Sequence, residues 1–264
     1  MNRKKDDHNR SDQPRPAALV TGGAIRMGRA IALALARHGY DLAIHYNTSH
    51  AEAEETAGRI RDTNARCKLF QWDLNDIENI DTWLGDIQKC FPNLQVLINN
   101  ASDYHQAAIR NTKTGDFDRQ IAVNLRAPFF LTQAFGQQCK SGQIINILDN
   151  KIASNQNAYA AYLISKKALA ELTKMAAYEL APTIRVNAVA PGVVLPASSR
   201  NPGYIDWRID GIPLRKQGHT DHVTQAIVSI LKNEFITGQI LTVDGGESVS
   251  HTGRHAANYE KPKE

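Results

Sequence analysis

The chain has 264 residues, of which 42% are hydrophobic and 22% are charged, and its formal net charge is +4 at pH 7. This composition excludes a disordered or fibrous protein and predicts a globular chain with a large buried core. The Lys and Arg residues form no dense patch, no apolar run reaches the roughly 18 residues of a membrane span, and the N-terminus lacks an apolar signal core. We therefore expect a cytoplasmic protein that binds neither nucleic acid nor a membrane.

The sequence predicts one central domain between two polar ends. Residues 1–15 and 250–264 are polar and charged, so we expect a disordered N-terminal tail and a C-terminal tail around a domain at 16–249. In the domain, helical stretches such as 27–38 and 51–63 alternate with short apolar runs, which are 17–21, 41–46, 68–72, 96–99, 143–148, 185–190 and 239–243. This alternation predicts an α/β protein: a single-domain, doubly wound Rossmann fold with a parallel seven-stranded sheet and helices on both faces.

A glycine-bearing turn follows the first predicted strand and opens into a helix, with the sequence Thr21-Gly22-Gly23-Ala24-Ile25-Arg26-Met27-Gly28. Glycines let the backbone approach a pyrophosphate, and the start of a helix offers free N–H groups and a positive dipole. An ordinary strand–turn–helix that needs glycine for a positive φ has the same pattern, so the turn alone is only moderately specific.

The second predicted strand ends in the neutral residues Asn47, Thr48 and Ser49. An acidic residue at this place would bind the adenine ribose of a dinucleotide and repel a 2′-phosphate. Its absence favours NADP(H) over NAD(H), although Ser49 is equally suited to starting the next helix.

The cysteines give no sign of a disulfide or metal framework. Cys67, Cys90 and Cys139 are odd in number and far apart, without the spacing of metal ligands. We expect free thiols and no bound metal.

Tyr162 and Lys166 are four residues apart, which places them on one face of a predicted helix. Tyrosine normally titrates near pH 10, and we expect the neighbouring ammonium to lower that pKa toward a useful range for proton transfer. An exposed pair on an amphipathic helix is the alternative interpretation of this spacing.

A long irregular region is predicted at 195–219, directly after a strand. It should project from the carboxyl edge of the sheet, where ligands bind in such folds. It carries Tyr204, Trp207 and Arg208, which we expect either to cover a substrate or to pack against a neighbouring subunit.

Residues 16–249 resemble the short-chain dehydrogenase/reductase family, through the glycine turn, the segment Asn99-Asn100-Ala101, the Tyr162–Lys166 pair and Pro191-Gly192. In that family the tyrosine donates a proton, and the lysine holds the nicotinamide ribose and tunes the tyrosine. Asn124 matches the asparagine that supports the lysine through water. The resemblance implies that the cofactor is bound by Gly22, Arg26, Met27, Gly28, Tyr46, Asn47, Ser49, Asp73, Leu74, Asn100, Ala101, Ser102, Tyr162, Lys166, Pro191 and Gly192.

Three departures from the common family pattern coincide. Arg26 stands where a glycine is usual, Ser102 replaces the glycine of the Asn-Asn-Ala-Gly segment, and Asp149 occupies the position of the serine thirteen residues before Tyr162. Together they resemble the pteridine reductase branch, which acts on dihydropterins, dihydromonapterin and dihydrofolate. In that branch an aromatic residue at the position of Tyr104 stacks on the pterin. The expected substrate-binding residues are Arg26, Ser102, Tyr104, Asp149 and Tyr162.

Asp149 decides between the possible reactions. A neutral donor suits the oxygen of a ketone, whereas a carboxyl beside Tyr162 suits a C=N bond, because the nitrogen must gain a proton. The alternative is a strand-end aspartate that caps the following loop. We therefore expect an NADPH-dependent reduction of a pterin or folate, with Asp149, Tyr162, Lys166 and Asn124 as catalytic residues.

Two other functions remain open at this point. One is a carbonyl or 3-oxoacyl thioester reductase of the same family, and the other is a non-catalytic dinucleotide-binding sensor, for which the Tyr162–Lys166 pair has no use. The final predicted strand resembles the family's last strand, which often lies at a subunit interface, and this implies a homotetramer.

Overall fold

The computed structural model describes residues 15–196, 202–250 and 254, so nearly all of the predicted N-terminal tail and most of the predicted C-terminal tail lie outside the described residues. Seven strands form one sheet in the order β3-β2-β1-β4-β5-β6-β7, and every neighbouring pair is parallel. The strands are β1 Ala17–Val20, β2 Asp41–Tyr46, β3 Cys67–Gln71, β4 Leu94–Asn99, β5 Gly142–Ile147, β6 Ile184–Pro191 and β7 Ile240–Val243. The predicted parallel seven-stranded Rossmann sheet is confirmed.

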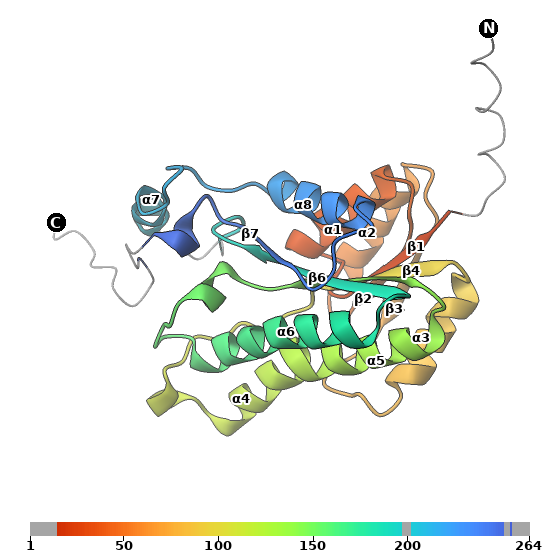
Figure 1. Ribbon diagram of the computed structural model, residues 1–264, viewed down its shortest axis with the longest axis horizontal. Helices are drawn as coiled ribbons and strands as arrows, with labels where there is room; N and C mark the ends of the chain where they lie inside the picture. Colours follow the sequence, from red (N-terminus) through yellow and green to blue (C-terminus); the bar gives the residue numbers. More distant parts are fainter. Residues whose placement is uncertain (1–14, 197–201, 251–253, 255–264) are drawn as a thin grey trace, which may run out of the picture.

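Helices cover both faces of the sheet (Figure 1). One layer contains α1 Arg26–Arg37, α2 His50–Arg61 and α8 Thr220–Lys232, and the other contains α3 Ile80–Cys90, α4 Thr114–Ile121, α5 Ala127–Gln138 and α6 Ala160–Glu179. The short helix α7, Pro202–Asp210, stands apart at one end of the molecule (Figure 1). Single-turn elements are η1 Ile109–Asn111, η2 Ala122–Arg126, η3 Asn150–Ala153 and η4 Glu247–Val249.

The inner strands of the sheet are apolar on both sides because each side faces a layer of helices, whereas the edge strands β3 and β7 are partly exposed. In β1, Leu19 belongs to the core beneath α3 and α5, while Ala18 and Val20 belong to the core beneath α1 and α8. All three side chains are fully buried. Burial on both faces explains why the strands appear in the sequence as unbroken apolar runs.

The irregular region predicted at 195–219 contains a helix, and this part of the prediction was wrong. α7 begins at Pro202, and proline is favoured at the first position of a helix because its missing N–H has no partner there. In the sequence, Pro202-Gly203 has the composition of a turn, which hides the helix start. Arg254, from the predicted C-terminal tail, lies with its guanidinium over the ring of Trp207 and pairs with Asp210.

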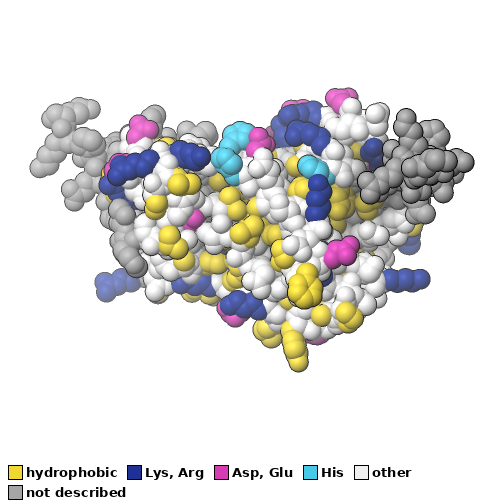
Figure 2. Space-filling model, turned by 45° about the horizontal axis from the view of Figure 1, so that its top comes forward, with side chains coloured by type: hydrophobic (Ala, Val, Ile, Leu, Met, Phe, Trp, Pro, Cys, Tyr) yellow, Lys and Arg dark blue, Asp and Glu magenta, His cyan; other side chains and the backbone are white. Residues whose placement is uncertain are grey.

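The strand order reverses at β1, whose neighbours are β2 and β4. The connections from these strands run to opposite faces, which opens a crevice at the carboxyl ends where such folds bind ligands. Within the described part of the chain, no helix is long and apolar enough to cross a membrane, and no group of three or more His, Cys, Asp and Glu residues could hold a metal ion. Cys67, Cys90 and Cys139 are free thiols. On the face drawn in Figure 2, Lys and Arg side chains are spread out, with Asp and Glu among them.

Candidate active site

A cleft of about 530 Å³ opens at this crevice, between the loops that follow the strands and the helices α6 and α7. Ten of the residues expected at the site line it: Arg26, Met27, Asn100, Ser102, Tyr104, Asp149, Tyr162, Lys166, Pro191 and Gly192. The others lie outside its lining: Gly22, Gly28, Tyr46, Asn47, Ser49, Asp73, Leu74, Ala101 and Asn124. The structure therefore brings the residues expected around the reacting atoms together in one cavity.

The turn after β1 is shaped for a group with negative charge. Helix α1 begins after Ile25, whose side chain makes no capping hydrogen bond, so no side-chain cap satisfies the free N–H groups of its first turn. A Cβ on Gly28 would lie 2.0 Å from the carbonyl oxygen of Gly22, so only glycine fits there. Uncapped N–H groups beside a closely packed glycine turn fit the pyrophosphate of a dinucleotide.

Arg26 has a φ of 52°, in the left-handed region that favours glycine. Its guanidinium donates a hydrogen bond to the carbonyl oxygen of Leu195, in the segment that leads toward α7. A non-glycine residue in this conformation costs on the order of 1–3 kcal/mol, which is kept where the surrounding structure or the function requires it. Arg26 thus connects the turn after β1 to the segment before α7 across the cleft.

Side-chain hydrogen bonds fix this turn to its neighbours. The Thr21 hydroxyl oxygen accepts from the backbone N–H groups of Asn100 and Ala101, and the Asn100 amide donates to the carbonyl oxygens of Thr21 and Gly22. His45 accepts from the N–H of Gly22 at 3.0 Å, and its other nitrogen donates to the carbonyl oxygen of Trp72. Burial lowers the pKa of His45 to about 4, so the ring is neutral at pH 7. Sequence reasoning did not single out this contact.

Asp149 is bonded in two directions at the end of β5. One carboxylate oxygen accepts the Tyr162 hydroxyl at 3.0 Å, and the other accepts the backbone N–H of Lys151 at 2.8 Å. The carboxylate therefore both caps the loop and contacts the tyrosine, so the two interpretations of Asp149 are compatible.

The pKa of Tyr162 is shifted in the direction opposite to the one expected. Burial and the nearby Asp149 raise this pKa well above 10, so the tyrosine is a neutral hydroxyl that holds its proton. Burial also raises the pKa of Asp149, although the hydrogen bonds from Lys151 and Tyr162 oppose that change. Burial lowers the pKa of Lys166 to about 8, against the opposing effect of Asp149. The expectation failed because it included the ammonium and left out burial.

Hydrogen bonds hold Lys166 against the end of β5 and Asn124 against α6, the helix that carries Tyr162. The Lys166 ammonium donates to the carbonyl oxygen of Ile147 at 2.9 Å and lies 5.9 Å from the centre of the Tyr162 ring. Asn124 is in the π-helical turn η2, a type of helix irregularity that is frequent at functional sites. Its side-chain amide donates to the Asp103 carbonyl oxygen and to the Ser165 hydroxyl, and its oxygen accepts from the N–H of Asp103. Asn124 thus fixes the loop after β4 to α6.

Aromatic rings form one wall of the cleft. The ring of Tyr104 stacks on Tyr159 with 4.8 Å between centroids, and it meets the edge of Tyr162 at 4.7 Å and 90°. Tyr104 is 53% exposed, so a large part of its surface is open to a ligand.

The residues expected around the adenine end lie at the ends of β2 and β3. The Tyr46 hydroxyl is hydrogen-bonded to His50, and the ring is buried against Ala24 and Ala53. Ser49 precedes α2 without a side-chain capping bond, and Asp73 accepts from the backbone N–H of Asn75. Asn47 and Asp73 are exposed at this edge of the sheet.

Lys151 and Tyr159 also line the cleft, although the sequence did not point to them. Lys151 follows Asp149 by two positions, and Tyr159 is the residue directly before α6, so helical spacing did not connect it to Tyr162. Of the three side chains of α7 that we expected to cover a substrate or to pack against a subunit, Tyr204 and Arg208 line the cleft, whereas Trp207 does not. Glu247, which holds both Lys151 and Arg208, comes from a distant part of the chain.

Comparison with known proteins places the chain in a family. The sequence profile of the family described as enoyl-(acyl carrier protein) reductase matches residues 23–248. The 3-oxoacyl-[acyl-carrier-protein] reductase FabG of Staphylococcus epidermidis is 32% identical over 238 residues, which cover 87% of this chain and 98% of that protein. An oxidoreductase of Bacillus subtilis, YhdF, is 32% identical over 242 residues, covering 88% of this chain and 83% of that protein.

Solved structures agree with this placement. The crystal structure of FolM alternative dihydrofolate reductase 1 from Brucella suis, in complex with NADP, superposes with a TM-score of 0.84. It is 31% identical and covers 94% of this chain and 97% of its own. This chain is an oxidoreductase that belongs to the short-chain dehydrogenase/reductase family.

Proposed function

We propose that this protein reduces a pterin with NADPH, taking a dihydropterin, dihydromonapterin or dihydrofolate as substrate. The observation that carries the proposal is the hydrogen bond from the Tyr162 hydroxyl to Asp149, inside the cleft. A ketone oxygen is better served by a neutral hydroxyl such as the serine common in the family, which stabilises the developing negative charge. It is suited instead to a substrate whose ring nitrogen must gain a proton.

The aromatic wall supports a flat heterocycle as substrate. Tyr104 presents its exposed ring beside Tyr162, so a pterin stacked on it would lie within reach of the tyrosine hydroxyl. Stacking of a base on an aromatic ring contributes about 1–3 kcal/mol in nucleic-acid sites. Arg26 and Ser102 line the same cleft and supply hydrogen-bond donors for the edge of the ring.

Three residues of the chain would donate the proton of this reaction and stabilise the charge that the donation leaves. NADPH, when bound, supplies the hydride that a ring carbon of the C=N bond accepts. Tyr162, neutral because its pKa is raised, donates its proton to the ring nitrogen, and the product gains one hydride and one proton. Asp149, whose own pKa is raised, is placed to hold a proton beside the tyrosine hydroxyl. Lys166 carries positive charge at neutral pH and stabilises the anion that the tyrosine leaves behind.

NADPH is proposed over NADH because no acidic residue follows β2 at Asn47, Thr48 and Ser49. The FolM structure was solved with NADP, which supports the same choice. Gly22, Arg26, Met27 and Gly28 would hold the cofactor at the turn after β1. Asp73 and Leu74 would lie at its adenine end, and Asn100, Ala101, Pro191 and Gly192 near its nicotinamide half.

The proposal is tested with purified protein, NADPH, and dihydrobiopterin, dihydromonapterin or dihydrofolate, followed at the nicotinamide absorbance. We expect turnover of at least one of these pterins. Turnover of a 3-oxoacyl thioester with none of the pterins would refute the proposal. That result would favour the second candidate, a carbonyl or 3-oxoacyl thioester reductase, which the FabG relatives support. Binding of NADPH without turnover of any of these compounds would favour a dinucleotide-binding sensor.

We also propose that the protein assembles as a homotetramer. Large apolar side chains are exposed on the neighbouring helices α5 and α6, among them Phe129, Ile164, Met175 and Tyr178, which is 91% exposed. Such exposed apolar groups mark association surfaces in otherwise polar proteins. Light scattering of the purified protein measures the assembly, and a monomer at micromolar concentration would contradict it.

A further inference from the structure

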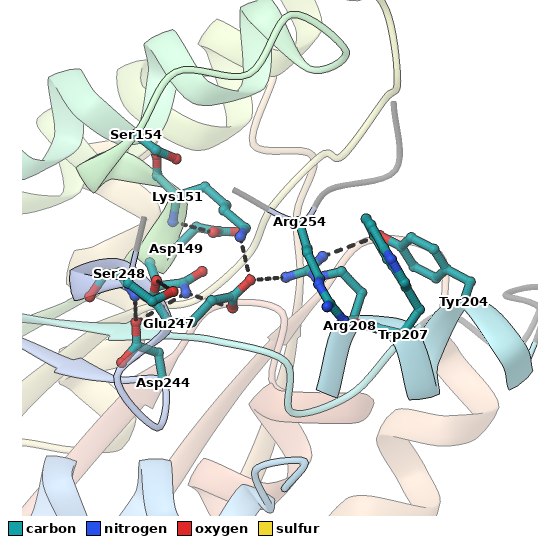
Figure 3. A network of polar contacts seen from close by, with 12 residues as sticks. Asp149, Lys151, Ser154, Tyr204, Trp207, Arg208, Asp244, Glu247, Ser248 and Arg254 are labelled. Carbon is teal, nitrogen blue, oxygen red and sulfur yellow. Dashed lines mark hydrogen bonds and ion pairs between the residues drawn. The ribbon is translucent and has the colours of Figure 1, made fainter. Parts of the chain in front are cut away.

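A buried carboxylate lies between two cations at the substrate end of the cleft. Figure 3 shows Lys151, from η3, and Arg208, from α7, reaching Glu247 of η4 from different sides. Both cations contact the same carboxylate oxygen at 2.5 Å, and the other oxygen accepts from the amide of Asn150. The three charged side chains are 16%, 12% and 7% exposed, so the cluster is largely removed from water.

The charges of this cluster do not balance. Burial alone would raise the pKa of Glu247, but Arg208 and Lys151 lower it overall, so Glu247 is ionised and carries one negative charge against two positive ones. The nearby Asp244 is held by Asn150 and by backbone N–H groups of its own turn, and it forms no ion pair within the part of the chain that the structure describes. Asp149 also attracts Lys151 but forms no ion pair with it among the described residues, so Glu247 is the one carboxylate that pairs with these two cations there. Buried charges in proteins are normally paired, which makes this cluster favourable for a further anion.

Lys151 and Arg208 also have N–H donors that form no hydrogen bond among the described residues. The Nε–H group of Arg208 is buried and has no hydrogen-bond partner among the described residues. The Lys151 ammonium has three N–H donors, and its contact with Glu247 uses one of them. A buried donor without a partner costs about 1–3 kcal/mol, and the two further donors of Lys151 are available to a ligand oxygen.

The cluster faces the reacting atoms. Lys151 and Arg208 both line the cleft that contains Asp149 and Tyr162, and the backbone N–H of Lys151 is bonded directly to Asp149. An anionic group on the cleft side of Lys151 and Arg208 would share this cavity with a ring placed beside Tyr162, so one substrate molecule could carry both.

We propose that Lys151 and Arg208 form a subsite for an anionic group on the side chain of the pterin substrate. The inference rests on the proposed pterin reduction and narrows its substrate class to pterins that carry a carboxylate or a phosphate. Glu247 is a positioning residue of this subsite, because it holds both cations without neutralising them.

The test compares substrates with and without an anionic side chain. Dihydrofolate carries carboxylates, dihydroneopterin phosphate carries a phosphate, and dihydrobiopterin and dihydromonapterin are neutral. We expect the wild-type protein to show a kcat/KM at least tenfold higher for one of the anionic substrates, mainly through a lower KM. Which of the two is preferred identifies the anion.

Arg208→Gln is the informative variant, because Glu247 keeps Lys151 as its partner and the cluster becomes neutral without losing its carboxylate. We expect kcat/KM for the preferred anionic substrate to fall about 10- to 100-fold, the range of a lost charged hydrogen bond, with values for the neutral pterins within about threefold. Arg208→Lys should retain most of the preference. Arg215→Gln is a matched control, because Arg215 follows the same helix and is exposed outside the cleft.

The outcomes separate the inference from the proposed function. Turnover of neutral pterins with no preference for an anionic side chain would overturn the inference and leave pterin reduction standing. An equal loss on neutral and anionic substrates in Arg208→Gln would also overturn it, because Arg208 would then only support the fold, as a lowered melting temperature would show. Absence of turnover with every pterin would refute the proposed function and this inference with it.

Discussion

Replacing Asp149 with serine tests whether the carboxyl group assists the proton transfer from Tyr162. The substitution restores the residue that is common in the family at this position and removes the carboxyl group beside Tyr162. The fold should survive, because a serine hydroxyl also accepts from a backbone N–H, here that of Lys151. We expect the free energy of unfolding to change by no more than about 1 kcal/mol, the usual range for exchanges between capping residues.

The expected loss of activity is larger. A positioned acid or base contributes about 10²–10⁴-fold to a proton transfer. Asp149 assists Tyr162 and does not act alone, so we expect the lower end, a loss of about 100-fold in kcat/KM for a dihydropterin, or about 2.7 kcal/mol of transition-state stabilisation. Serine offers one oxygen where the carboxyl group offers two, so Asp149→Asn is needed to separate loss of the acid from loss of a hydrogen bond.

Steady-state rates with NADPH and a dihydropterin measure this loss, and chemical denaturation reports the stability of the same samples. Asp149→Asn should lose a similar factor, because an amide keeps the shape of the side chain but is far too weak an acid to pass a proton to the ring nitrogen. Ser154→Ala is the control, since Ser154 is exposed and lies outside the cleft. Unchanged rates in Asp149→Ser would refute the reasoning and leave Asp149 as a loop cap.

Three further predictions follow from the charges and the backbone. Lys166 has a pKa of about 8 and loses its positive charge above that pH, so kcat/KM for NADPH, which reports the free protein, should fall as the pH rises above about 8. A kcat/KM that stays constant up to about pH 10, where lysine usually titrates, would contradict this prediction. Arg26→Gly should leave the free energy of unfolding within about 1 kcal/mol of the wild type, because glycine accepts the positive φ, while KM for NADPH or for the pterin rises; an unchanged KM would show that the guanidinium binds neither. Glu247→Ala should lower the free energy of unfolding by about 3–5 kcal/mol, because it leaves Lys151 and Arg208 buried without their counter-ion. A decrease in the free energy of unfolding of less than about 1 kcal/mol in denaturant titrations would contradict the burial of this cluster.

The sheet could be predicted from the sequence because its inner strands are buried on both faces and its edge strands still carry short apolar runs. The run at 41–46 coincides with β2, and the other strands begin or end within two residues of the expected positions. α7 was missed because its proline and glycine have the composition of a turn, although proline also starts helices. Local composition does not distinguish these two uses.

The site was predictable where family spacing or helical periodicity connects its members. Asp149 and Tyr162 are thirteen residues apart, and the structure joins them by a hydrogen bond. Lys151 and Glu247 are 96 residues apart, and no local pattern indicates that they meet. The direction in which the Tyr162 pKa is shifted also could not be predicted from the sequence, because it depends on how deeply the side chain is buried.

The most direct test of pterin reduction is a comparison of two substrate classes with the same protein and NADPH. Initial rates with a dihydropterin or dihydrofolate are measured beside initial rates with a 3-oxoacyl thioester, at matched concentrations. The geometry of Asp149 and Tyr162 predicts a kcat/KM for the best pterin at least 100-fold above that for the thioester, equal to the factor expected from the carboxyl group. Efficient reduction of the thioester with no turnover of any pterin would contradict the account.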